Sequence, residues 1–291
     1  MRRRRLPFLL GLGLAVAIGT GLRAAQQAAP ARADLDEIRK VSALLETDVL
    51  NRANETIAEI EDVVLSPQGE VLYAILSYGG VAGVGAKYTA IPWDLLDAQH
   101  VNGKWAANLD MTEDALKQAP TFPKDDFRVL TNPQWVAQAR QFFAGRGGRP
   151  GREPGAQANR AVSWVLRASK LIDAPLRGAG NETIGEVEDL LLDRNGRVAF
   201  AIIGRGGVLN IGEKYVPVPW SALGIKYDPN DMSVTTTINM TREQLEKAPL
   251  VEGDNYSTLL NPGFPDQVNR YFGAARPTGN QPPDQRQGGQ P

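Results

Sequence analysis

The feature that most constrains this chain is an internal repeat. The segment GGVAGVGAKYTAIPW, residues 79–93, returns as GGVLNIGEKYVPVPW at residues 206–220, which is 127 residues later. At this offset 20 of the 40 positions from 54 to 93 are identical, and after a two-residue insertion the likeness continues to residue 143. Two copies are too few for a solenoid, so we expect two like domains in tandem, each burying its own core.

Composition marks the boundaries of these domains. Residues 145–160, GRGGRPGREPGAQANR, are rich in Gly, Pro and Arg and have no hydrophobic period, which is typical of a flexible linker. Residues 274–291 have a similar composition and are predicted to form a disordered tail. The predicted organisation is therefore a first copy over residues 34–144 and a second copy over residues 161–273.

Residues 1–33 have the pattern of an export signal peptide. Four arginines at 2–5 precede an apolar run at 6–22, and Ala31-Arg32-Ala33 supplies the small residues of a cleavage site. We predict cleavage before Asp34 and a periplasmic or extracellular protein. The alternative is an uncleaved anchor in the inner membrane, because an apolar run of about 17 residues is close to the lower limit for a membrane span.

Composition also excludes several classes of function. The chain has no cysteine and one histidine, so thiol nucleophiles, zinc–thiolate sites, iron–sulfur clusters and Ser/His/Asp sets cannot be assembled convincingly. Without the leader the chain has 26 basic and 33 acidic residues and a net charge of −7, which argues against nucleic-acid binding. We predict no catalytic residue, no cofactor, no bound metal and no nucleic acid, and a membrane contact only if the leader is retained.

The pattern within each copy is mostly β. In the second copy Asn195-Gly196 separates two apolar runs, which is a strong hairpin signal because both residues tolerate positive φ. Alternation breaks at Glu188-Asp189, and likewise at Glu61-Asp62 of the first copy, which predicts a β-bulge in each.

Further strands are predicted at residues 87–93, 214–220 and 234–239. Prolines confine the first two to sheet edges or strand ends, because proline cannot donate to the ladder. Short strands with bulges and glycine bends favour a small closed barrel, which leaves no exposed edge.

Each copy is predicted to end in short helices. Thr241 to Gln244 form a capping box, and Thr112 keeps the cap without the glutamine. Asn132-Pro133 and Asn261-Pro262 each place a cap residue before a proline at the first helical position.

Residues 169–223 resemble the PRC-barrel domain family. The family pattern is present in order as Ser-x-Leu-Ile, Ile-Gly-x-Val-x-Asp-Leu, Asp-x-x-Gly-x-Val and Gly-Gly-x-x-x-Ile-Gly-x-Lys-x-Val-x-Val-Pro-Trp. The first copy departs mildly, with Ala58, Ser66 and Thr89 in place of Gly, Asp and Val. The family is similar to the cytoplasmic domain of the photosynthetic reaction centre H subunit and to the C-terminal domain of a ribosome-maturation factor.

This resemblance implies a six-stranded antiparallel β-barrel that serves as a docking module without bond chemistry. The expected fold class is thus mainly β, with two tandem small antiparallel β-barrels that are each followed by one or two short α-helices. No quinone-linked proton role is expected, because no histidine or acidic relay for it can be placed here.

The repeated Gly-x4-Gly-x-Lys loops are not predicted to bind phosphate. The lysine is one residue late, Tyr replaces the magnesium-binding Ser/Thr, and a strand follows where a helix is required. We interpret the glycines as bends and the tryptophans as core anchors, with each lysine lying across an aromatic ring or pairing with a carboxylate. These structural repeat residues are Gly79, Gly80, Gly85, Lys87, Trp93, Gly206, Gly207, Gly212, Lys214 and Trp220.

One cluster of carboxylates recurs in both copies. Its members are Glu59, Glu61, Asp62, Glu186, Glu188 and Asp189. Carboxylates so placed can serve acid–base catalysis or bind a hard cation such as calcium, but their mid-strand positions favour structural pairing. His100 has no copy in the second domain and is expected at the surface.

The leading hypothesis is an exported, non-enzymatic protein of two PRC-barrel domains that binds an unidentified protein partner in the cell envelope. Tandem duplication favours this role, because two linked copies raise avidity when both engage. The alternative is a small-molecule or cation (calcium) binding module.

Overall fold

The computed structural model describes residues 35, 37–79, 85–101, 104–124, 126–144, 164–204, 214–228 and 233–273. The predicted export signal, linker and tail lie outside these residues, as do Gly80, Gly206, Gly207 and Gly212 of the repeated loops.

The first copy contains eight strands, two short 3-10 helices and two α-helices within the described residues. Its elements are β1 (Arg39–Lys40), β2 (Asp48–Leu50), β3 (Thr56–Leu65), β4 (Val71–Tyr78), β5 (Lys87–Pro92), η1 (Trp93–Leu95), β6 (Leu96–Val101), β7 (Lys104–Leu109), α1 (Glu113–Leu116), β8 (Thr121–Phe122), η2 (Phe127–Thr131) and α2 (Pro133–Phe143).

The second copy repeats this order and adds a short helix after its first strand. Its elements are β9 (Leu166–Arg167), α3 (Ala168–Leu171), β10 (Pro175–Arg177), β11 (Thr183–Leu192), β12 (Val198–Gly204), β13 (Lys214–Pro219), η3 (Trp220–Ala222), β14 (Gly224–Tyr227), β15 (Val234–Thr237), α4 (Arg242–Glu246), β16 (Val251–Glu252), η4 (Ser257–Leu260) and α5 (Phe264–Tyr271).

Each copy forms an eight-stranded sheet from seven of its own strands and one strand of the other copy. The strand order is β6-β7-β2-β3-β4-β5-β8 in the first sheet and β14-β15-β10-β11-β12-β13-β16 in the second. The eighth strand of the first sheet is β9, which pairs with β3, and that of the second is β1, which pairs with β11.

The expectation of closed, wholly antiparallel barrels is wrong in two respects. Among the strands that the structure describes, neither sheet closes, because its two end strands do not pair, and one of them in each sheet (β8 or β16) has only two residues. In addition, β2 runs parallel to β7 and β10 runs parallel to β15. These parallel partners are separated in the sequence by several strands, so no tight hairpin forces them to be antiparallel.

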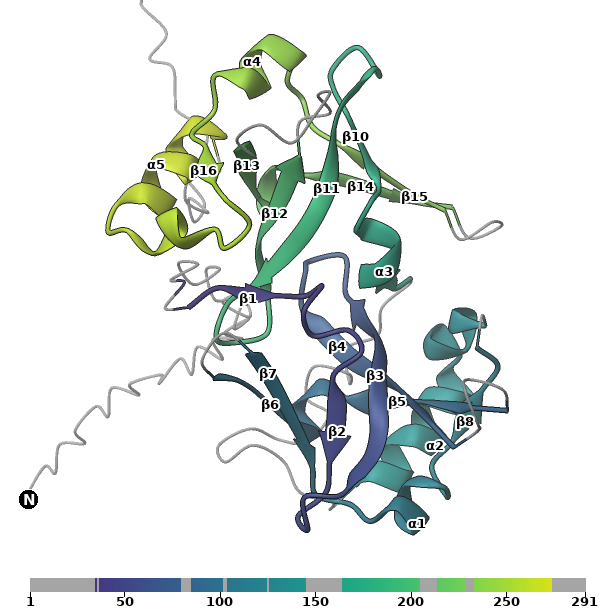
Figure 1. The fold of residues 1–291 in the computed structure, drawn as a ribbon. Helices are drawn as coiled ribbons and strands as arrows, with labels where there is room; N and C mark the ends of the chain where they lie inside the picture. Colours follow the sequence, from purple (N-terminus) through teal and green to yellow (C-terminus); the bar gives the residue numbers. More distant parts are fainter. Residues whose placement is uncertain are drawn as a thin grey trace, which may run out of the picture. The chain divides into compact units, whose positions relative to one another are not determined.

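The first strand of each copy lies on the sheet of the other copy. Arg39 and Lys40 of β1 stand opposite Leu192 and Leu191 of β11, and Figure 1 shows β1 beside that strand. In the same way Leu166 and Arg167 of β9 stand opposite Leu65 and Val64 of β3. The exchange is reciprocal, because each residue of β9 lies 127 positions after its counterpart in β1.

The main hydrophobic core is shared between the copies. It is continuous from Leu44 and Ile60 of the first copy to Leu171 and Ile184 of the second. A smaller cluster around Leu259 belongs to the second copy, yet Leu35 and Ile38 of the first copy pack against it. The expectation that each copy buries its own core is therefore wrong, because the exchanged strands carry apolar neighbours into the other half.

The predicted hairpins and bulges are present. In β3 Ile60 pairs with Leu76 and Asp62 with Ile75, so Glu61 is the extra residue of a bulge, and Glu188 holds the same place in β11. The second hairpin turns at Gly196, with a φ of 73°. Asn195 does not share the positive φ expected of it, because Asp193 Oδ1 accepts from the backbone N–H of Asn195 and Arg197 and stabilises a longer turn.

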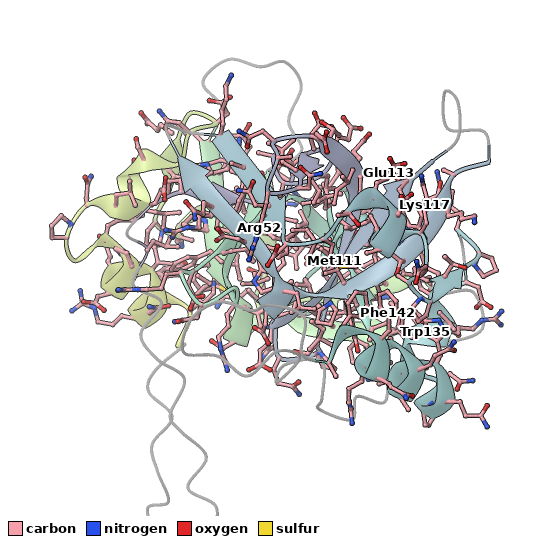
Figure 2. The ribbon with its side chains drawn as sticks, turned by 90° about the horizontal axis from the view of Figure 1, so that it is seen from below. Arg52, Met111, Glu113, Lys117, Trp135 and Phe142 are labelled. Carbon is pink, nitrogen blue, oxygen red and sulfur yellow. The ribbon has the colours of Figure 1, made fainter. Side chains whose placement is uncertain are left out.

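The helices begin largely where their capping residues predict. The Thr241–Gln244 capping box forms, Thr112 accepts a hydrogen bond from the backbone of Ala115, and Asn132 caps α2. Figure 2 shows Trp135 and Phe142 on α2, and Glu113 with Lys117 at α1, where the two form an ion pair of 2.9 Å.

Asn261 does not cap α5, contrary to the expectation. It ends η4, and α5 starts after Gly263, whose φ is 82°. The left-handed backbone of Gly263 interrupts a helix that would start at Pro262, so the helical run begins only at Phe264. Among the described helices, none is both long and apolar enough to span a membrane.

Candidate functional site

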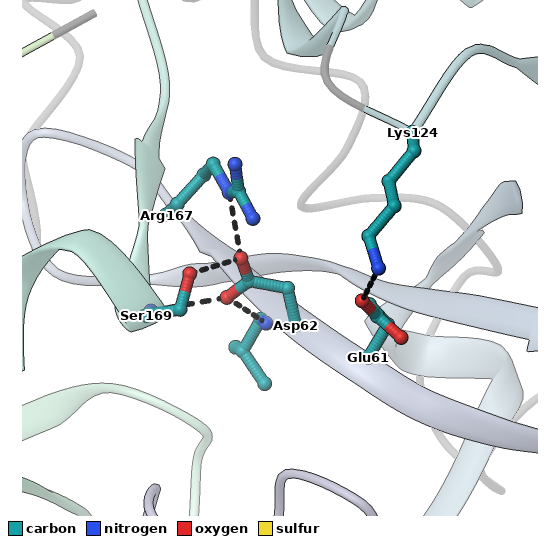
Figure 3. Close-up of polar contacts among 6 residues, drawn as sticks. Glu61, Asp62, Lys124, Arg167 and Ser169 are labelled. Atoms are coloured by element: carbon teal, nitrogen blue, oxygen red, sulfur yellow. Dashed lines mark hydrogen bonds and ion pairs between the residues drawn. The ribbon is translucent and has the colours of Figure 1, made fainter. Parts of the chain in front are cut away.

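The β-bulge of β3 turns Asp62 inward. Glu61, the extra residue, points outward and forms an ion pair with Lys124 at 3.0 Å (Figure 3). The side chain of Asp62, in contrast, is 0% exposed. A buried carboxylate must be paired or hydrogen-bonded to offset the loss of hydration. Three of the four donors that meet this need come from the second copy.

Asp62 binds the start of the second copy through both oxygens (Figure 3). Oδ2 accepts from Arg167 Nε at 2.7 Å and from Ser169 Oγ at 2.6 Å. Oδ1 accepts from the backbone N–H of Ser169 at 3.1 Å and of Val63 at 2.8 Å. The carboxylate thereby fixes the exchanged strand β9 and the first turn of α3 against β3.

Asp189 makes the equivalent contacts with the first copy. Oδ2 accepts from Ser42 Oγ at 2.5 Å, and Oδ1 accepts from the backbone N–H of Ser42 and Leu190 at 3.0 and 2.8 Å. Here Lys40 takes the place of Arg167, and its ammonium lies over the ring of Tyr256 and donates to the carbonyl of Asp254.

This difference leaves the two carboxylates in unlike electrostatic surroundings. Burial raises the pKa of Asp189 above its ordinary 3.8, although the hydrogen bonds from Ser42 and Leu190 and the charge of Lys40 lower it in part. Asp62 instead has the guanidinium of Arg167 as a direct ionic partner.

The hairpin turns and the repeated tryptophans form a second pair of reciprocal contacts. Trp220 Nε1 donates to the carbonyl of Pro67 at 3.3 Å, and its indole covers Gly69. Trp93 covers Gly196 in the same manner. Because a side chain at either glycine would collide with an indole ring, the glycine is needed both for its positive φ and for the close approach.

Glu70 and Arg197 lie between these two turns. They form an isolated antiparallel bridge and an ion pair. On either side, Val71 N–H donates to the Gly196 carbonyl at 2.9 Å and Val198 N–H donates to the Gly69 carbonyl at 2.8 Å. The start of β4 and the start of β12 are thus joined across the copies.

The remaining residues singled out in the sequence lie elsewhere. Glu59, Glu186 and Glu188 are exposed on β3 and β11, and Lys87 and Lys214 are exposed at the starts of β5 and β13. Within the described part of the chain, Lys124 and not Lys87 pairs with Glu61 and lies over the Tyr88 ring, 5.5 Å from its centroid. Gly79 and Gly85 have φ values of 68° and 80°, as expected of bends.

His100 does not lie at the surface, which corrects the expectation for this residue. Its side chain is 7% exposed, and its Nδ1 lies 2.6 Å from Glu37 Oε1. It also packs edge-on against Trp105, whose Nε1 donates to the carbonyl of Lys40. The cause is that Glu37, just before β1, and Trp105 of β7 both contact its ring.

Sequence reasoning missed the residues that complete these contacts, namely Ser42, Ser169, Arg167, Glu70 and Arg197. A signal was available for the two serines, which stand at the repeat offset of 127 and open the same Ser-x-Leu motif. No such signal marks Glu70 and Arg197, because these positions differ between the copies.

A comparison with protein-family models agrees with this two-copy architecture. The model of the PRC-barrel domain matches residues 36–115 and 165–238, which together are more than half of the 291 residues. No curated protein matches the chain. The chain belongs to the PRC-barrel domain family and carries two copies of that domain.

Proposed function

We propose that this chain is an exported, non-enzymatic docking protein of the cell envelope, in which two joined PRC-barrel copies bind a protein partner. One observation carries the proposal: residues of the PRC-barrel sequence pattern join the two copies to each other. Asp62, Asp189, Trp93 and Trp220 all contact the other copy, so they serve to build one scaffold. A joined scaffold presents matched surfaces on its two halves.

The burial and the hydrogen bonds of Asp62 and Asp189 support a binding role over acid–base chemistry. General acid–base catalysis requires a carboxylate within reach of a substrate proton. Asp62 is enclosed and bonded by four donors, and Asp189 by three. Within the described ranges no three His, Cys, Asp or Glu residues gather as metal ligands, so calcium is not part of this proposal.

The matched surfaces supply positions for a direct test. Glu59 and Glu186 are equivalent in the two copies and both are exposed. Each is replaced in turn by a photoreactive phenylalanine analogue in the full chain, and cells are irradiated before the envelope is isolated. We expect one and the same protein to be cross-linked from both positions, because equivalent surfaces present the same chemistry.

The matched control is the same pair of variants without residues 2–33, which retains the chain in the cytoplasm. The proposal is contradicted if neither position gives a specific adduct, or if the leaderless chain gives the same adducts. Mass spectrometry of the chain recovered from the envelope tests export separately, because cleavage after Ala33 leaves Asp34 as the first residue.

A further inference from the structure

The contacts between the copies are reciprocal. Ser42 binds Asp189 while Ser169 binds Asp62, and Val71 bonds Gly196 while Val198 bonds Gly69. In every case both partners are shifted by 127 positions, so the same surface is used by both copies. This is the arrangement of an isologous interface, of the kind that joins two identical subunits.

In an isologous interface, a residue at the two-fold axis lies next to the equivalent residue of the other partner. Glu70 and Arg197 are 127 residues apart, hold the same place in the two copies, and contact each other. The reciprocal bonds of Val71 and Val198 flank them on both sides. This contact is therefore the centre of the interface.

The charges at this centre are opposite, and one of them is enclosed. The Glu70 side chain is 3% exposed and that of Arg197 is 39% exposed. If two first copies paired, Glu70 would face Glu70, and if two second copies paired, Arg197 would face Arg197. Two glutamates at the enclosed place of Glu70 would be strongly unfavourable, because neither could recover its lost hydration. Two arginines would repel each other and would leave both without a carboxylate partner.

We propose that the Glu70–Arg197 contact is the specificity determinant of pairing, so that each copy accepts only a PRC-barrel copy with the opposite charge at this position. The serine–aspartate and tryptophan–glycine contacts do not discriminate, because each is present in both directions. Arg167 and Lys40, which occupy the equivalent place beside the aspartates, carry the same sign of charge. The partner that fits this surface is thus the complementary copy of the same chain, which occupies it in the structure. This inference does not depend on the envelope partner.

The test uses two full-length variants, Glu70→Arg and Arg197→Glu. Each places like charges at the centre of its own interface, and neither can satisfy the contact by pairing with itself. When the two variants are unfolded and refolded together, opposite charges meet only if the chains exchange copies. The segment between Ala144 and Trp164 reaches on the order of 60 Å when extended, which permits such an exchange.

We expect native mass spectrometry, with one variant isotopically labelled, to find a complex of one chain of each kind. Each variant refolded alone is expected to give no such two-chain species and a lower unfolding midpoint. The control is the double variant Glu70→Arg/Arg197→Glu, which keeps opposite charges within one chain and is expected to be monomeric with a midpoint near that of the unaltered protein.

Two results would overturn the proposal. The first is that the mixed variants remain single chains with unaltered midpoints. The second is that the double variant is no better folded than either single variant, which would assign the effect to side-chain shape and not to charge. If the single variants fail to fold, recovery of the double variant decides the question.

Discussion

Gly69 lies beneath the indole of Trp220, so that a methyl group on its α-carbon would stand 2.7 Å from Nε1. The two residues belong to different copies, and Gly196 has the same relation to Trp93. The glycine of the family turn and the tryptophan that ends the Pro-Trp strand thus work as a pair between copies.

Gly69→Ala is predicted to destabilise the protein by about 2–4 kcal/mol. The left-handed backbone alone costs an alanine about 1 kcal/mol, and the collision with Trp220 adds about 1–3 kcal/mol of overpacking. The measurement is the free energy of unfolding from urea titration.

Gly85→Ala is the matched control for this substitution. Gly85 has a similar φ of 80°, but no described atom lies within 4 Å of the place its methyl group would take. It should lose only the backbone contribution of about 1 kcal/mol. Equal losses for the two variants would contradict the contact between Gly69 and Trp220.

Asp62→Asn and Asp189→Asn are predicted to differ at neutral pH. The amide NH₂ of an asparagine at position 62 meets the guanidinium of Arg167, which cannot accept a hydrogen bond, so the loss should be about 2–4 kcal/mol. At position 189 the NH₂ meets the hydroxyl of Ser42, which can accept, so the loss should stay within about 1 kcal/mol. Chemical denaturation of both variants measures the difference, and a larger loss at position 189 would refute the assigned roles.

Asp189 is also predicted to make stability depend on pH. Its pKa in the folded protein lies above the ordinary 3.8, so between these two values the folded protein binds its proton more tightly than the unfolded chain does. The free energy of unfolding should therefore fall, relative to that of Asp189→Asn, as the pH rises from about 4 to about 7. Urea titrations of the two proteins across this range test the sign, and a difference that grows with pH would be inconsistent with burial as the cause.

Asn132→Ala is predicted to destabilise the protein by about 1 kcal/mol, because the Asn132 side chain accepts from the first N–H groups of α2. Asn261→Ala is the control, since α5 begins after Gly263 and Asn261 is not its cap. The thermal midpoint of unfolding compares the two. A larger fall in the midpoint for Asn261→Ala than for Asn132→Ala would show that Asn261 does cap a helix, as its sequence position suggests.

Local features of the fold could be predicted from the sequence because their causes are local. The breaks in alternation at Glu61 and Glu188 give bulges, Gly196 gives a turn, and Thr241 with Gln244 gives a capping box. Each depends on residues a few positions apart, whose backbone preferences and hydrogen bonds do not need the rest of the chain.

The relation between the copies could not be predicted in this way. Strands β1 and β9 have two residues each and could pair with either copy by their sequence alone. Their position is decided by hydrogen bonds from Ser42 and Ser169 to the buried aspartates of the other copy. In each of these bonds the serine and the aspartate are more than 100 residues apart in the chain. Barrel closure could not be predicted for a related reason, because it depends on whether the end strands are long enough to meet.

The central claim is that the two copies form one folding unit, joined by exchanged strands and a shared core. Differential scanning calorimetry of the full chain tests it most directly, with Gly69→Ala as the perturbed form. We predict a single transition whose van't Hoff and calorimetric enthalpies agree, and which shifts as a whole in the variant. Two separable transitions, one of them unmoved by the substitution in the first copy, would contradict the claim.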